Sequence, residues 1–221
     1  MEVINDYYVE EQNKGIIKVF TRMFLGLLVT AIVSYLTYKT GLYIGIPYSV
    51  LAIVEIVVVL IFSLMYRKLS ATMVSVLFYS YAVVNGLTMA TIFAVFDMNT
   101  ISQAFFVTAL LFGGLALYGY TTKKDLTKIG TIFTVALVVG LVVSVINLFA
   151  RSSMISIILD WVMLLVFCGL TVHDMNNIKY MQNYVDCDND KLYVYCAMDL
   201  YLDFINIFIR LLSIFGKTKR D

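Results

Sequence analysis

This chain of 221 residues has one proline, one histidine and three cysteines, and only 14% of its residues are charged. So little proline allows long, uninterrupted helices. The histidine and cysteines show neither zinc-site spacing nor a nucleophile with its base, and metalloprotease, P-loop and dinucleotide-binding patterns are lacking. We therefore predict no enzymatic activity and no cofactor. A formal net charge of +1 gives no reason to expect a nucleic-acid partner.

What the chain does contain is apolar sequence, which makes up 61% of its residues and exceeds what a soluble core of this size can bury. About 20 mostly apolar residues are needed to cross a bilayer. No stretch shows the period-two alternation of a membrane barrel, so the predicted fold class is all-α. We expect one membrane domain over 1–221, with short polar tails at 1–16 and 216–221. Seven predicted transmembrane helices run near 17–38, 44–66, 71–96, 101–121, 130–150, 154–175 and 195–215.

Lysine and arginine in short loops predict the orientation, because cytosolic loops carry the excess of these residues. With the N-terminus in the cytosol, the outer loops hold only Lys39 and Arg151. The inner side then carries Lys14, Lys18, Arg22, Arg67, Lys68, Lys123, Lys124, Lys128, Lys179 and Lys191. The basic C-terminal tail would lie outside if all seven segments span, and inside if the last segment is re-entrant. We favour seven spans, because the last segment has no glycine or proline before Gly216.

Small residues within the apolar segments predict where two helices approach each other closely. Gly26 lies in the first segment and Gly86 in the third. Gly113, Gly114 and Gly119 lie in the fourth. We expect these glycines to serve packing.

Five carboxylates lie within or at the end of apolar segments, where an ionised group is expensive: about 2.5–3.5 kcal/mol at the bilayer centre on insertion scales. Such groups generally face a bundle interior or a water-filled cavity, and they indicate a functional site. They are Glu55, Asp160, Asp174, Asp199 and Asp203.

Asp174 and Asp203 are the predicted centre of that site. They lie in the last two segments, which one connection joins, so both carboxylates can meet inside the bundle. Two carboxylates in contact in a low dielectric cannot both stay ionised cheaply, and the pair shares a proton. Its alternative ligand is a hard cation such as Ca²⁺, which prefers oxygen. Competition between H⁺ and a cation makes a pH-controlled ion site.

The other candidates have supporting or structural alternatives. Glu55 either lines a pore or pairs with a buried donor. Asp160, beside Trp161, is expected at the interface or held neutral. Asp199 shares a helix face with the aspartate four residues later and is a supporting candidate. His173 can sense pH, although neighbours on a helix point about 100° apart, so contact with the following aspartate is not implied.

Two strings resemble signatures of the transmembrane Bax inhibitor motif family, specifically of its compact bacterial members. They are VHDMNNIK around Asp174 and LYLDFINIFIRLLSIFG around Asp203. The second-segment string VEIVVVLIFSLMYRK is similar as well. The resemblance covers nearly the whole chain in length, number of segments and short loops. It implies a seven-helix fold in a bacterial plasma membrane, with the last helix central and wrapped by the others.

The resemblance also implies roles for particular residues. Bacterial calcium-leak members of the family use two aspartates as a pH sensor, at positions that match Asp174 and Asp203. A basic residue at the end of the second helix latches onto the pair in the closed state, and Arg67 is the nearest match. His173 departs from the family pattern, which has an aromatic there. The connection between the two aspartates is also longer than expected.

The predicted function is therefore a pH-sensitive, calcium-permeable leak channel whose gate, Asp174 and Asp203, binds a proton or Ca²⁺. A proton-coupled calcium exchanger would use the same carboxylates for alternating ions. A regulator of other membrane proteins would show no ion flux. A two-aspartate membrane protease is a further alternative, against which the lack of a GxGD string counts. Calcium flux driven by a pH gradient distinguishes an exchanger from a leak.

Overall fold

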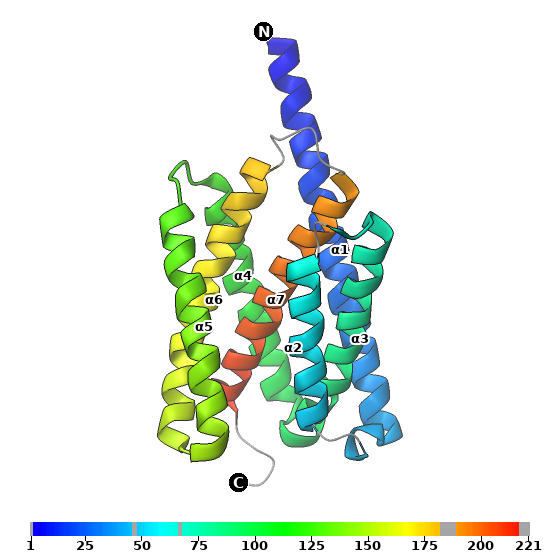
Figure 1. Ribbon diagram of the computed structural model, residues 1–221, viewed down its shortest axis with the longest axis vertical. Coiled ribbons are helices and arrows are strands. Elements are labelled where there is room, and N and C mark those ends of the chain that lie inside the picture. Colours follow the sequence, from blue (N-terminus) through cyan, green and yellow to red (C-terminus); the bar gives the residue numbers. More distant parts are fainter. Residues whose placement is uncertain (1, 46–47, 66–67, 182–188, 217–221) are drawn as a thin grey trace. The chain divides into compact units, whose positions relative to one another are not determined.

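The computed structural model describes residues 2–45, 48–65, 68–181 and 189–216 (Figure 1). Within these ranges the chain forms seven α-helices and one short 3-10 helix, with no β-strand, which confirms the all-α prediction. The elements are α1 (Glu2–Thr40), η1 (Leu42–Ile44), α2 (Tyr48–Met65), α3 (Ala71–Val95), α4 (Met98–Thr121), α5 (Thr127–Ala150), α6 (Ser153–Met181) and α7 (Asn189–Phe215).

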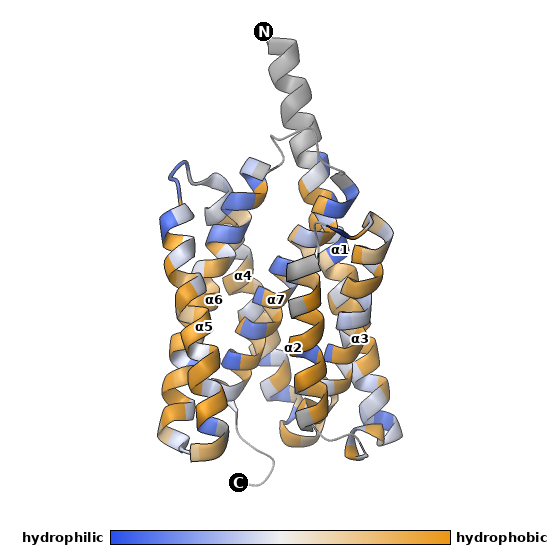
Figure 2. Ribbon diagram, in the orientation of Figure 1, coloured by the Kyte–Doolittle hydropathy of each residue, from blue (hydrophilic) through white to orange (hydrophobic). Residues whose placement is uncertain are grey.

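Six of the helices in the described ranges are long and apolar enough to cross a membrane, so the chain is a multi-pass membrane protein. The remaining one is α2, and its crossing stays a prediction. α7 is continuous over the predicted last segment, as expected for a spanning helix. Its candidate span is 67% buried, against 11% for that of α5. In Figure 2, α7 carries hydrophilic positions along its length, whereas α5 is largely hydrophobic.

Local signals in the sequence set several helix ends. Ser70 caps α3, because its Oγ accepts a hydrogen bond from the Met73 backbone N–H at 3.3 Å. α1 ends before Gly41, whose φ of 72° a glycine adopts without strain. After α5, the Asn147 side chain bonds the backbone of Ser152 and closes the turn to α6. α1 begins at Glu2, so most of the predicted N-terminal tail is helical.

The chain divides into two compact units, and the division falls within α7. Unit 1 comprises Met1–Asp97 and Gln182–Tyr201. Unit 2 comprises Met98–Met181 and Leu202–Asp221. The five carboxylates are therefore distributed between two separately packed bodies.

In unit 1, α1 packs against α3 through glycines. A Cβ added at Gly86 would lie 2.8 Å from Val33 Cβ and 2.9 Å from the Thr30 carbonyl oxygen. One added at Gly26 would lie 2.5 Å from Cζ of Phe78. The close approach predicted for both glycines is confirmed.

In unit 2, α6 packs against both α4 and α5. Gly119 of α4 lies so close to α6 that an added Cβ would collide with the Val172 carbonyl oxygen. Gly169 of α6 lies equally close to α5, because an added Cβ would collide with the ring of Phe133. Gly113 and Gly114 have no described atom within 4 Å of an added Cβ, so the contacts predicted there are wrong. The side chains of unit 2 that carry function are thus held between closely packed helices.

Candidate functional site

Asp203 is the most deeply buried of the five carboxylates, with 3% of its surface exposed. Its side chain lies near the Cys168 thiol of α6, the helix that carries Asp174. The next residue, Phe204, packs edge-to-face against Phe112 of α4. Close packing in unit 2 therefore holds this part of α7 beside α6 and α4.

Asp174 contacts its neighbour in sequence. Its Oδ1 lies 2.8 Å from Nδ1 of His173, and both side chains are partly buried. The His173 ring occupies the space that a side chain on Gly130 of α5 would take, so this glycine makes room for the imidazole. The sequence did not imply this contact, since it depends on the side-chain rotamers of two adjacent residues.

The predicted pairing of Asp174 with Asp203 stays a prediction, although both residues belong to unit 2. Arg67, the predicted latch, lies outside the described residues. Among the residues that are described, no three His, Cys, Asp or Glu side chains gather in a group that could hold a metal ion.

Asp160 is not a lone interfacial residue, because α7 engages both of its carboxylate oxygens. Nη1 of Arg210 donates to Oδ1 at 2.8 Å, and Oγ of Ser213 donates to Oδ2 at 2.5 Å. The side chains of Asp160 and Arg210 are 15% and 23% exposed. The result is an ion pair between two membrane-spanning helices.

Glu55 of unit 1 ends a chain of hydrogen bonds through three other helices. Its Oε1 accepts from Nδ2 of Asn85 on α3 at 3.2 Å, and Oδ1 of Asn85 accepts from the Tyr201 hydroxyl on α7 at 3.1 Å. That hydroxyl lies 2.6 Å from Oγ1 of Thr30 on α1. Glu55 thus pairs with a buried donor, one of its two expected roles. Its role in lining a pore stays a prediction.

Asp199 is half-buried in the part of α7 that belongs to unit 1, whereas Asp203 belongs to unit 2. The supporting role expected for Asp199 stays a prediction.

Sequence reasoning missed the partners of these carboxylates. Asp160 and Arg210 lie at equal sequence distances from the helix ends that the α6–α7 connection joins. Antiparallel neighbours bring such positions to the same depth, so an arginine inside an apolar segment was a usable signal. Tyr201 and Asn85 gave no comparable signal, because a polar side chain at helical spacing does not identify its partner.

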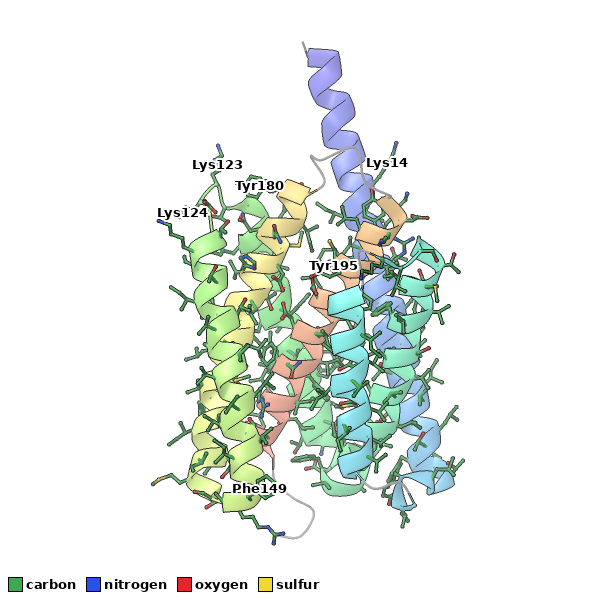
Figure 3. All side chains as sticks on the ribbon, viewed as in Figure 1. Lys14, Lys123, Lys124, Phe149, Tyr180 and Tyr195 are labelled. Carbon is green, nitrogen blue, oxygen red and sulfur yellow. The ribbon has the colours of Figure 1, made fainter. Side chains whose placement is uncertain are left out.

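The charged groups of unit 2 are unevenly distributed along its helices. Figure 3 shows Lys123, Lys124 and Tyr180 at one end of this unit and Phe149 at the other. Asp174 lies in the half of α6 that ends near Tyr180, and the Asp160 ion pair lies toward the Phe149 end. This asymmetry agrees with the rule used to orient the chain, and the cytosolic position of the N-terminus stays a prediction.

Sequence comparisons relate nearly the whole chain to known proteins. A family model described as inhibitor of apoptosis-promoting Bax1 matches residues 12–220. Inner membrane protein YbhL of Escherichia coli K12 is 35% identical over an alignment of length 212, which covers 91% of this chain and 91% of the relative. An uncharacterized protein of Borreliella burgdorferi is 32% identical, and the alignment covers 95% of this chain and 94% of the relative. An uncharacterized membrane protein of Streptococcus pyogenes serotype M3 is 32% identical over 97% of this chain and its own full length.

Proposed function

The chain belongs to the Bax inhibitor family, and from this premise we propose that it is a pH-sensitive, calcium-permeable leak channel. The observation that carries the proposal is a buried carboxylate, Asp203, beside the helix that bears a second one, Asp174, within one unit of a membrane protein. Carboxylates inside membrane helices commonly mark ion or proton pathways.

The proposed gate works through competition between a proton and Ca²⁺. When Asp174 and Asp203 share a proton, they carry one charge and stay in contact, which closes the path. When both are ionised, like charges repel strongly in a medium of low dielectric and separate. The separated carboxylates then offer oxygen ligands to a passing Ca²⁺. Calcium flux should therefore rise with pH.

His173 and Arg67 are the proposed cationic partners of the gate. The imidazole of His173 already contacts one oxygen of Asp174 and compensates its charge when protonated. Arg67 is the proposed latch of the closed form, which is an ion pair with the aspartates. Glu55 and Asp199 are proposed as supporting groups along the path.

Calcium flux through proteoliposomes at a series of pH values tests the proposal. Wild-type protein should release Ca²⁺ down its gradient, faster at higher pH. Asp203→Asn should make the flux insensitive to pH, because one titrating carboxylate is gone. Asp125→Asn, in an exposed loop, is the matched control and should keep the wild-type profile. Equal fluxes from wild type and Asp203→Asn at every pH would refute the proposed gate.

The same vesicles separate the channel from its alternatives. An imposed pH gradient without a Ca²⁺ gradient drives net Ca²⁺ movement only through an exchanger. A protein that regulates other membrane proteins gives no flux under either gradient. Either result would overturn the leak channel.

A further inference from the structure

We propose that Asp160 and Arg210, with Ser213 beside them, form a second ion-controlling site, at which the balance of the two opposite charges sets how strongly cations are attracted to the path. The site would act on small inorganic ions. This inference deepens the proposed channel function, and its calcium part rests on that function. The gate aspartate Asp174 lies 14 residues further along α6, about 21 Å at 1.5 Å per residue, so the two sites are separate.

The geometry is that of a built site. Arg210 and Ser213 are three residues apart, which places them on one face of α7. Each engages a different oxygen of Asp160, at 2.8 and 2.5 Å. Both oxygens of this α6 carboxylate are thus engaged by side chains of α7.

Helix packing alone does not require these charges. Replacing a buried ion pair by apolar side chains of similar volume often costs no stability, because the pair loses hydration on burial. Both charged side chains also retain partial exposure, 15% for Asp160 and 23% for Arg210. Ionised groups in membrane segments generally face water-filled space or a partner, and each of these two has the other as its partner. Because both side chains also keep exposed surface, we infer that the pair acts on ions outside it.

The two charges of the pair have opposite signs, so removing one or the other should have opposite effects on ions. The intact pair of Asp160 and Arg210 is neutral overall. Removing the arginine charge leaves a negative site that attracts cations, whereas removing the aspartate charge leaves a positive site that repels them. If the pair only stabilises the contact between α6 and α7, both substitutions should change the measurement in the same direction, because either one breaks the ion pair.

The first test measures local charge without relying on ion flux. Ser213, which is exposed, is replaced by cysteine as a reporter in a chain whose native cysteines are replaced by alanine. The protein is placed in lipid nanodiscs, which leave both faces accessible, and reacted with an anionic and a cationic thiol reagent of equal size. The parent without the reporter is the background control.

Adding Arg210→Gln should shift the ratio of reaction rates roughly 25-fold toward the cationic reagent, since a unit charge at 4 Å changes each of the two rates about fivefold, in opposite directions, even in water. Adding Asp160→Asn should shift the ratio in the opposite direction. The exchanged pair, Asp160→Arg with Arg210→Asp, keeps the site neutral and should restore the reporter's own ratio. An unreactive cysteine in all variants, or an unchanged ratio, would overturn the inference.

The second test is calcium flux through proteoliposomes. Arg210→Gln should raise the flux several-fold and Asp160→Asn should lower it, with the exchanged pair near wild type. Changes of the same sign in both single variants would overturn the inference and leave a purely structural tie. If the wild type carries no Ca²⁺, the channel proposal fails, and the thiol rates still decide whether the charged site exists.

Discussion

Glu55 in unit 1 is held by the neutral amide of Asn85, whereas Asp160 in unit 2 is held by the guanidinium of Arg210. A carboxylate with neutral donors can lose or gain its proton without leaving an opposite charge uncompensated. A carboxylate in an ion pair cannot, because its partner stays charged. The two units therefore handle the same problem, an acid in a membrane, with different sensitivities to substitution.

The largest effect expected from this contrast is on the ion pair of unit 2. Asp160→Leu should lower the free energy of unfolding by about 4 kcal/mol, because it leaves Arg210 without its counter-charge among apolar side chains. Asp160→Leu combined with Arg210→Met should recover most of that loss. Denaturation midpoints in a fixed detergent would measure both. A single variant as stable as the double one would remove the proposed difference between the units.

Helix contacts provide a second comparison. Gly119→Ala in unit 2 should lower the free energy of unfolding by about 3 kcal/mol, because the new methyl group meets a rigid backbone carbonyl of α6. Gly86→Ala in unit 1 should have a smaller effect, about 2 kcal/mol, since its contacts are looser. Gly114→Ala, with no described atom within 4 Å, is the control and should not destabilise. Equal losses in all three variants would show that close approach is not the cause.

The polar chain of unit 1 should be less sensitive than the ion pair. Tyr201→Phe removes the hydroxyl that bonds Asn85 and Thr30 and should lower the free energy of unfolding by about 1.5 kcal/mol. Tyr118→Phe, on an exposed face of α4, should change little. Thermal denaturation of the three proteins would measure the difference. A loss as large as that of Asp160→Leu would contradict the contrast between neutral and charged partners.

The sequence predicted what depends on short stretches of chain. Apolar length placed α3 and α5 within a few residues of their observed ends, and apolar context identified Asp203 as buried. Partners were harder, because Arg210 and Asp160 are 50 residues apart and tertiary packing brings them together. The division of α7 between two units also has no local signal, since the helix continues through it.

The smallest effect on stability is expected from substitution of Asp125. This residue lets the contrast between neutral and charged partners of a carboxylate be tested within unit 2. This loop carboxylate is held by neutral donors, as Glu55 is: its Oδ1 accepts from the Thr127 hydroxyl at 2.6 Å and from the Thr127 backbone N–H at 2.9 Å. The side-chain bond, followed by the backbone bond, lowers the pKa of Asp125 from its ordinary value of 3.8. A carboxyl whose pKa is lower when folded stabilises the protein above the unfolded pKa, and that stabilisation is lost as the pH falls through the folded one.

Asp125→Ala should therefore lower the denaturation midpoint slightly at neutral pH, and its difference from the wild type should shrink once the pH falls below 3.8. Thr127→Val removes the hydroxyl donor and should give part of the same pH-dependent difference. Midpoints measured for the three proteins across this range isolate the carboxylate from the other titrating groups, which all three share. A difference that did not change with pH would mean that Asp125 acts through loop geometry, and the likeness to Glu55 would then not extend beyond the membrane-spanning helices.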